Sequence, residues 1–437
     1  MKTLLAAKSE LTPAQSRVIE MSATENRVIF GVAGTGKTQV LLHRARYLSD
    51  SLKIPSNRYH IFVQNNVMKA YLRSSLSLLN ISDTAISTFN SWCVSFYRYH
   101  INTVLPENQD KTPQFDLIRR GILSKIKFAD GSSFFDNIFH SMLNMVRPNN
   151  ITVPIYDFVL VDDGQELDSI SLDIISTIAR HITVVADDKH KLNDVGLSST
   201  ELLIKLKQRY SLHLNGAFRC SPFIINLAAQ FIDDTETRRA YLYEAKIPEG
   251  EKETPVLYYA ANAQDEKNKL IEVMRNRLVK GESVAVLLFN EQLINEFAEA
   301  LQDPRLEVKK ILSTSRNDGN QNKLDFTNDC PKLITFQHAQ GLTFDTVIIP
   351  QLVNNGHFKS LSPQQLQKIL FSAITRATKW VFLSTLNTAP LPLLNKITPL
   401  KEQGLLNIQT FVPRRMVKKF IASTHTPAET DDLIDLL

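Results

Sequence analysis

The sequence predicts an α/β protein built on mainly parallel sheets, and two observations carry that prediction. Short apolar runs alternate with longer helical runs along most of the chain, which is the pattern of α/β folds. The apolar runs are continuous rather than alternating, as expected for strands that helices cover on both faces. We expect strands at 27–31 (RVIFG), 59–64 (YHIFVQ), 158–163 (FVLVDD), 182–187 (ITVVAD), 283–290 (SVAVLLFN), 333–337 (LITFQ), 345–350 (DTVIIP) and 380–384 (WVFLS). Expected helices include 38–50, 290–302 and 363–377.

Composition is that of an ordinary soluble globular protein, with 437 residues, 43% of them hydrophobic and 22% charged. The net charge of +5 allows a nucleic-acid partner without arguing for one. The three cysteines form no CxxC pair, so neither a zinc site nor a disulfide framework is expected. No apolar run is long enough to span a membrane or to act as a signal peptide, so we expect a cytoplasmic protein without membrane association.

The order of the strands suggests two domains and a tail. A polar stretch after the fourth expected strand places the boundary near residue 205, which gives domains at 1–205 and 206–389. Residues 101–150 are rich in Asn, Asp and Pro and are expected to form a small helical insertion in the first domain. The tail, 390–437, ends in an acidic amphipathic segment that could dock a partner, although a loose terminus is the simpler expectation.

A glycine-rich loop, GVAGTGKT, follows the first expected strand and opens the first helix. Gly31, Gly34 and Gly36 allow a tight turn that aims backbone N–H groups at phosphate oxygens, next to the positive end of the helix. In such a loop Lys37 bridges the β- and γ-phosphates, and the Thr38 hydroxyl holds Mg²⁺. The strand before and the helix after are the context that makes this pattern specific for a nucleoside triphosphate.

Two acids end the third expected strand, in the segment YDFVLVDDGQEL. We expect Asp162 to hold a water of the Mg²⁺ shell and Asp163 to orient the attacking water. A pair of acids after a strand is only moderately specific, because a solvated turn has the same composition. Gln165 and Glu166, which follow, make the pattern more specific.

With these motifs in place, the chain resembles the UvrD/Rep-like branch of superfamily 1 helicases. The resemblance runs from Leu11 to about Lys379 and rests on nine motifs in the family's order: LTPAQ, GVAGTGKT, VQNNVMKAYL, STFNSWC, VDDGQEL, VVADDKH, GAFRCSPFI, TFQHAQGLTFDTVIIP and FSAITRATKWVFLS. It implies two RecA-like domains with ATP and Mg²⁺ bound in the cleft between them. The interval between the seventh and eighth motifs is short, which implies a compact form without a large accessory subdomain.

The resemblance also implies roles for individual residues. Gln15 would contact the adenine, Gln165 and Gly341 would line the nucleotide site, and Arg219 and Arg376 would sense the γ-phosphate from the second domain. The residues that it implies at the nucleic acid are Asn65, Thr88, Trp92 and His338. For Trp92, as for Phe89 and Phe336, packing in the core is as well supported by the sequence as stacking on a base.

Several positions depart from the family pattern. Asp163 stands for the usual glutamate and is one methylene shorter. His190 and Ala186 stand for glutamine and glycine in the sixth motif. The remaining departures are Gln64 for an aromatic residue, Gln340 for lysine and Thr343 for glutamate. The nucleotide site is therefore largely kept, whereas the parts that track a strand are reduced.

The leading hypothesis is an ATP-dependent motor, a superfamily 1 helicase or translocase on single-stranded DNA, with RNA still open. One alternative is a helicase-like ATPase switch that signals to a protein partner, which the departures favour. Another is a pseudo-ATPase scaffold that only binds DNA. Lys37, Thr38, Asp162 and the two arginines argue against that last reading.

Overall fold

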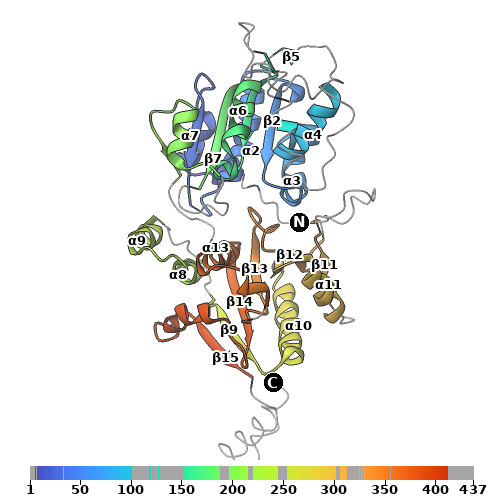
Figure 1. Cartoon of the computed structure of the whole chain (residues 1–437), viewed down its shortest axis with the longest axis vertical. Coiled ribbons are helices and arrows are strands. Elements are labelled where there is room, and N and C mark those ends of the chain that lie inside the picture. The colour runs from blue at the N-terminus through green and yellow to red at the C-terminus, as the bar shows by residue number, and fades with distance from the viewer. Residues whose placement is uncertain are drawn as a thin grey trace, which may run out of the picture.

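Two parallel sheets, each covered by helices, lie one above the other along the long axis of the molecule (Figure 1). This computed structural model describes residues 5, 7–32, 34–100, 118–119, 122, 126–127, 151–152, 154–187, 196–214, 220–244, 253–301, 306–312, 324, 326, 328–354 and 356–411. Among these residues, no helix is both long and apolar enough to cross a membrane.

The first sheet has the strand order β3-β2-β6-β7-β1-β8, and its described pairings are parallel. Its strands are β1 (Arg27–Phe30), β2 (Tyr59–Val63), β3 (Ile86–Thr88), β6 (Tyr156–Val161), β7 (Ala179–Ala186) and β8 (Leu212–His213). A separate short pair joins β4 (Ile126–Lys127) to β5 (Ile151–Thr152).

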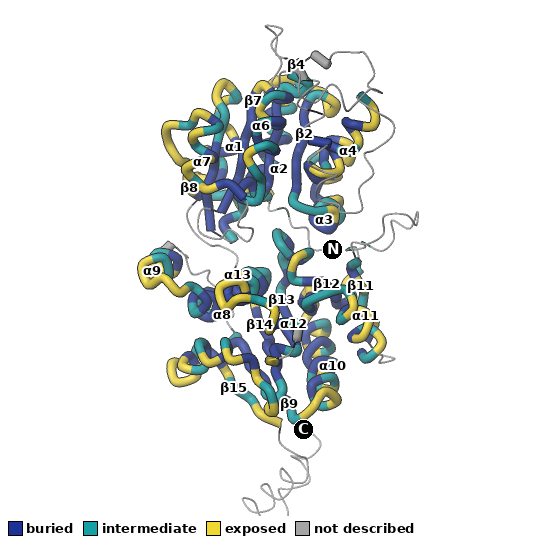
Figure 2. Tube along the Cα trace, in the orientation of Figure 1, coloured by how far each residue is buried: buried dark blue, intermediate teal, exposed yellow. Residues whose placement is uncertain are grey.

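Helices cover both faces of the first sheet, because neighbouring residues of each strand point to opposite sides. Ile29 packs in one buried cluster with α2 and α3, whereas Val28 packs in another with α4 and α6. The helices of this domain are α1 (Pro13–Glu20), α2 (Lys37–Ser51), α3 (Asn66–Leu78), α4 (Phe89–His100), α6 (Ser169–Ile178) and α7 (Ser199–Lys205). Figure 2 shows the buried strands inside and the exposed residues on the outer helices and turns.

The second sheet has the order β11-β12-β10-β13-β14-β9-β15, again with parallel pairings. Its strands are β9 (Val256–Ala260), β10 (Val284–Leu288), β11 (Lys309–Lys310), β12 (Lys332–Thr335), β13 (Phe344–Ile349), β14 (Ala377–Leu386) and β15 (Asn407–Thr410). Its helices are α8 (Pro222–Ala229), α9 (Thr235–Glu244), α10 (Ala263–Val279), α11 (Glu291–Ala300), α12 (Gly356–Lys359) and α13 (Pro363–Ile374). One face packs on α10 and α11, and the other on α8 and α13.

Short 3₁₀ turns connect these elements. They are η1 (Lys8–Glu10), η2 (Ser56–Arg58), η3 (Asp83–Ala85), η4 (Gly164–Glu166), η6 (Pro392–Lys396) and η7 (Thr398–Lys401).

The predicted fold class is confirmed: two tandem parallel-sheet α/β domains of the RecA-like kind. The sheets shift the expected domain limits. Leu212–His213 pairs with β1, so the first domain continues past residue 205. The amide of Ser221 donates to the carbonyl of Thr378, so the second domain has begun by there. Asn407–Thr410 pairs with β9, so the second domain also includes residues that were assigned to the tail.

We therefore propose a domain boundary between 214 and 220 and a second domain that ends near residue 410. Both shifts have one cause. Short edge strands carry little apolar signal of their own and are defined by the neighbour with which they pair. Most of the predicted insertion at 101–150, and residues 412–437 of the predicted tail, lie outside the described residues.

One buried arginine joins three elements of the first domain. Arg44 on α2 donates from Nη1 to the carbonyls of Val18, Ile19 and Met21, at 3.1, 3.0 and 2.7 Å. Its Nε donates to Thr183 Oγ1 on β7 at 2.9 Å. The last carbonyls of a helix have no partner within that helix, and here a guanidinium satisfies those of α1. Burial lowers the pKa of Arg44 to about 10, which still leaves it charged.

We expect Arg44→Met to destabilise the first domain by about 3 kcal/mol, because it leaves several buried carbonyls without a donor. Arg46→Met on the same helix is the matched control, since Arg46 is partly exposed and forms an ion pair with Asp50. In thermal unfolding the first variant should melt about 6–12 °C lower, and the second should melt near the wild-type temperature. Equal melting temperatures for the two variants would contradict the assigned role.

Candidate functional site

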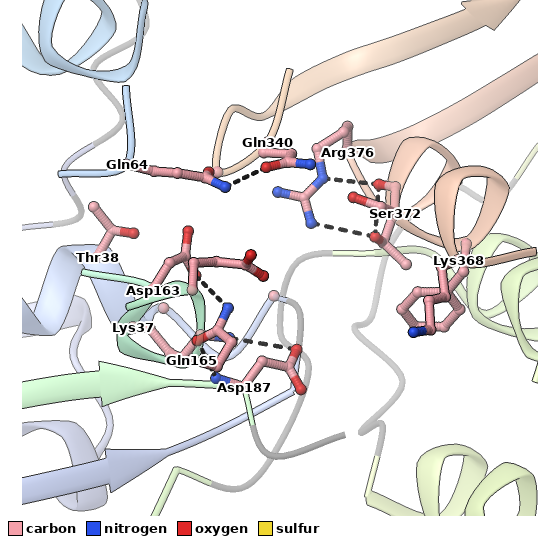
Figure 3. A pocket seen from close by; sticks show the side chains of 16 residues that line it. Lys37, Thr38, Gln64, Asp163, Gln165, Asp187, Gln340, Lys368, Ser372 and Arg376 are labelled. Carbon is pink, nitrogen blue, oxygen red and sulfur yellow. Dashed lines mark hydrogen bonds and ion pairs between the residues drawn. The ribbon is translucent and has the colours of Figure 1, made fainter. Parts of the chain in front are cut away.

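The carboxyl ends of β1, β2, β6 and β7 open into a cleft that the second domain borders from the opposite side (Figure 3). The space in and above the cleft amounts to about 790 Å³, a figure that includes solvent at its open side. In sheets of this type ligands bind beyond the carboxyl ends of the strands. The first domain contributes Gly34, Gly36, Lys37, Thr38, Gln64, Asp163, Gln165, Glu166 and Asp187. The second contributes Gln340, Gly341, Lys368, Phe371, Ser372, Thr375 and Arg376.

The glycine-rich loop turns sharply just before α2. Gly36, the residue before α2, has φ +82°, and a Cβ there would come within 2.7 Å of Gln15 Nε2. Lys37 folds back over the loop, and its Nζ donates to the carbonyls of Gly31 and Val32 at 2.7 and 3.2 Å. The ammonium group therefore lies among backbone groups where a phosphate would compete for it.

The two predicted acids end β6 directly beside this loop. Thr38 Oγ1 donates to Asp162 Oδ2 at 2.7 Å. Burial and the neighbouring Asp163 raise the pKa of Asp162 to about 7, although the hydrogen bond from Thr38 and the charge of Lys37 oppose the shift. Asp163 has φ +50°, a left-handed conformation that aspartate tolerates better than most residues. This turn directs its side chain into the cleft (Figure 3).

The residues at this corner fit a magnesium ion that is shared with phosphates. Within the described part of the chain, no group of three or more His, Cys, Asp or Glu side chains could hold a metal alone. Mg²⁺ is usually held by one or two carboxylates together with substrate phosphates and waters. Thr38 and Asp162 supply a hydroxyl and a carboxylate of this kind. A nearby cation would also favour the ionised form of Asp162.

Gln165 links the acids of the site to each other. Its Nε2 donates to Asp163 Oδ1 at 3.3 Å, and its Oε1 accepts from the backbone amide of Asp187 at 2.9 Å. Asp187 in turn lies 3.8 Å from the Lys37 ammonium. The predicted list of site residues did not include Asp187, although its place at the end of a strand in the sixth motif was a usable signal.

Gln15 lies behind the glycine-rich loop. Its Oε1 accepts from the amide of Thr12 at 2.9 Å, and its Nε2 donates to the carbonyl of Thr35 at 3.0 Å. In this arrangement the side chain supports the loop, and its contact with adenine stays a prediction.

Arg376 and Gly341 reach the cleft from the second domain. Arg376 Nε donates to the carbonyl of Ser372 at 2.9 Å, which fixes the guanidinium at the end of α13. Lys368, two turns earlier on α13, borders the same cleft and was not predicted. The sequence gives no signal for Lys368, because a lysine on an amphipathic helix usually faces solvent. Arg219, like the substituted His190, lies outside the described residues.

Two of the residues predicted at the nucleic acid cap helices in this structure. Asn65 Oδ1 accepts from the amide of Met68 at the start of α3, at 2.8 Å. Thr88 Oγ1 accepts from the amide of Ser91 at the start of α4, at 3.1 Å. His338 is half-buried just after β12, and burial lowers its pKa. A contact between these three residues and nucleic acid stays a prediction.

Trp92 lies in the core, which is one of the two positions that the sequence leaves open for it. Only 7% of the residue is exposed. Its ring stacks on Phe96 at 4.7 Å and meets Phe62 edge-on at 5.9 Å, and its Nε1 donates to Tyr156 Oη at 2.9 Å. Phe89 is buried in the same aromatic cluster. Both the faces and the polar edge of the indole are thus engaged within the first domain.

Comparisons with known families fit the two-domain architecture. The model of the UvrD/REP helicase N-terminal domain matches residues 11–130, and that of the UvrD-like helicase C-terminal domain matches residues 333–384. No curated protein matches the chain. A solved structure of the C-terminal domain of a possible DNA helicase from Lactobacillus plantarum WCFS1 is 13% identical, with a TM-score of 0.33. That similarity covers 44% of this chain and 98% of the other.

Proposed function

The chain belongs to the UvrD-like helicase family, and on that premise we propose that it is an ATP-dependent motor on single-stranded DNA. The observation that supports this most is the composition of the cleft. A phosphate-binding loop and two acids come from one domain, and an arginine comes from the other. A nucleotide bound there would touch both domains, so its hydrolysis would change their relative position.

The first domain would bind and position the triphosphate. Backbone amides around Gly34 and Gly36 would cradle the phosphates, and Lys37 would leave the loop carbonyls to contact them. Thr38 and Asp162 would hold Mg²⁺, which neutralises charge on the phosphates when bound.

Asp163 would orient the attacking water and accept its proton. Gln165 supports this role, because it holds Asp163 on one side and the Asp187 amide on the other. The aspartate reaches less far than the glutamate of the family, so we expect its position to limit the rate.

The second domain would complete the site when the cleft closes. Arg376, with Arg219 at the boundary between the domains, would contact the γ-phosphate and stabilise the charge that develops during transfer. Lys368 adds positive charge to the same wall.

A second candidate function is an ATPase switch that signals to a protein partner. The observation that favours it is the contact of Gln64 with Gln340 across the domains. These side chains replace the family's aromatic residue and lysine, and here they bind each other. Strand displacement separates the two candidates, because a switch needs DNA-dependent turnover but no unwinding.

We expect Lys37→Ala to reduce Mg²⁺-dependent ATP turnover to background, because the phosphates lose their main cation. Asp163→Asn should abolish hydrolysis while ATP still binds, because the amide cannot accept the proton. Asp163→Glu, which restores the missing methylene, should match or exceed the wild-type rate. Phosphate release measures turnover, and Lys8→Ala is the control at an exposed lysine. Normal hydrolysis by Asp163→Asn would assign the proton to another acceptor.

We expect Arg376→Ala to lower turnover about 10³-fold or more, with a much smaller change in ATP affinity. The reason is that the arginine is expected to act mainly on the charge of the transition state. Arg219→Ala should behave in the same way. Arg239→Ala on α9 is the control, since Arg239 is an exposed arginine of the same domain. If both arginine variants kept normal turnover, hydrolysis would not need the interdomain cleft.

We expect single-stranded DNA to bind and to stimulate ATP turnover. The logarithm of the affinity should fall linearly with that of the salt concentration, with a slope of about −0.7 per phosphate contact. A fluorescent oligonucleotide titrated at several salt concentrations measures the slope. An RNA of the same sequence tests whether the protein distinguishes ribose from deoxyribose. Trp92→Phe is the control, because a buried indole should leave the affinity unchanged. An affinity that did not depend on salt, or no binding, would contradict the proposal that the protein is a motor on single-stranded DNA.

A further inference from the structure

A tyrosine of the first domain holds one residue of the second domain by both of its backbone groups. Tyr71 Oη, on α3, donates to the carbonyl oxygen of Thr343 at 2.6 Å and accepts from the amide of Thr343 at 3.1 Å. A single phenol group thus acts as donor and acceptor across the domain interface. The two bonds fix the position of the segment 340–344, which follows β12 and leads into β13.

The tyrosine that makes these bonds is largely buried. Tyr71 is 9% exposed, and its ring meets Phe326 edge-on at 5.3 Å and lies 6.2 Å from Phe344. Hydrogen bonds that exclude water are electrostatically stronger, and their buried partners are costly to leave unpaired. One cluster of buried apolar residues includes Tyr71 and Met68 together with Leu342 and Phe344, so the core continues through this contact.

The same segment borders the nucleotide cleft. Gly341 lines the cleft and has φ +77°, and a Cβ there would come within 3.2 Å of Met68 Sδ on α3. Next to Gly341 the side-chain Nε2 of Gln64 donates to Gln340 Oε1, and both glutamine side chains also line the cleft. The contact made by Tyr71 therefore lies directly beside the site where we propose that nucleotide binds.

Three departures from the family pattern gather at this contact. Gln64, Gln340 and Thr343 stand where relatives of this kind have an aromatic residue, a lysine and a glutamate. In this chain the first two bind each other and the third is held by Tyr71. All three positions therefore make contacts between the two domains.

We infer that Tyr71 is a positioning residue for nucleotide turnover, which holds the 340–344 segment against α3 before nucleotide arrives. The inference rests on the proposed ATP hydrolysis. Only the fraction of molecules with the domains correctly placed binds a ligand that touches both, so the apparent affinity is proportional to that fraction. Tyr71 raises the fraction through its two bonds.

Tyr71→Phe keeps the ring and its packing but removes both bonds. The KM for ATP should rise about tenfold, and binding of a non-hydrolysable ATP analogue should weaken by about the same factor. At saturating ATP the kcat should stay near the wild-type value, because bound nucleotide then holds the two domains together. Without nucleotide, amide hydrogen exchange in 340–344 should become faster, because the Thr343 amide loses its acceptor.

Tyr156→Phe is the matched control. Its partly buried hydroxyl accepts from Trp92 Nε1 at 2.9 Å within the first domain, so the variant also loses one hydrogen-bonded phenol hydroxyl. It should lower stability without changing the KM for ATP, the analogue affinity or exchange in 340–344. The comparison of the two variants distinguishes misplacement of the segment 340–344 from a general loss of stability.

The outcomes distinguish the inference from the proposed function. If the wild-type protein did not hydrolyse ATP, the proposed function would fail, whereas analogue binding and exchange would still test the positioning role of Tyr71. If the wild type hydrolysed ATP and Tyr71→Phe kept its KM and analogue affinity, the inference would be overturned, whatever the exchange rate. A fall in kcat with an unchanged KM would overturn it equally, because that result describes a group acting on the chemical step.

Discussion

Parallel pairing of the strands is the constraint on which the site depends. The loops after β1, β2, β6 and β7 meet at one edge of the first sheet because those strands run in the same direction. In the observed order β7 lies between β1 and β6. This places Asp187, at the end of β7, between the glycine-rich loop and the β6 acids, 3.8 Å from the Lys37 ammonium. An antiparallel neighbour would bring its amino end to this edge and remove that carboxylate.

The excess of carboxylates at this edge of the sheet explains why bound cations would stabilise the site. Asp162, Asp163, Glu166 and Asp187 lie around one lysine. Burying a carboxylate beside another raises its pKa, as happens at Asp162, unless positive charge is supplied. The first domain alone supplies little, because Lys37 is its one cation lining the described cleft. Mg²⁺ beside Asp162, together with Lys368 on α13 and Arg376 just after it, would supply the rest, so the electrostatics of binding would favour an approach of the two domains.

The sequence predicts most of the inner strands of the two sheets and none of their edge strands. The eight expected strands are all present, because continuous apolar runs mark strands buried on both faces. The edge strands Ile86–Thr88, Leu212–His213, Lys309–Lys310 and Asn407–Thr410 were missed, because two to four residues carry no periodicity and pairing alone defines them. The inner strand Val256–Ala260 was missed as well, although its five residues are mostly buried.

The residues of the candidate site likewise fall into those that local sequence patterns predict and those that they do not. Loop glycines, Lys37, Thr38 and the two acids follow from spacing within one segment. Lys368, and the support that Gln15 gives to the loop, depend on how separate elements pack, so no local pattern reveals them. Motif similarity assigned Trp92 to a nucleic acid, but similarity of residue type does not decide between a groove and a core.

The contact between α3 and the segment 340–344 affects how much a bound DNA strand could contribute to closing the two domains. A ligand shifts a conformational equilibrium only by its different affinity for the two states. In this structure Tyr71 and Gln64 already join the domains beside the nucleotide cleft, without any strand. Protein contacts that favour domain approach leave less of the closure free energy for DNA to supply. On the proposed function, the departures at Gln64 and Gln340 would both weaken contacts to a DNA strand and reduce the need for that strand in domain closure.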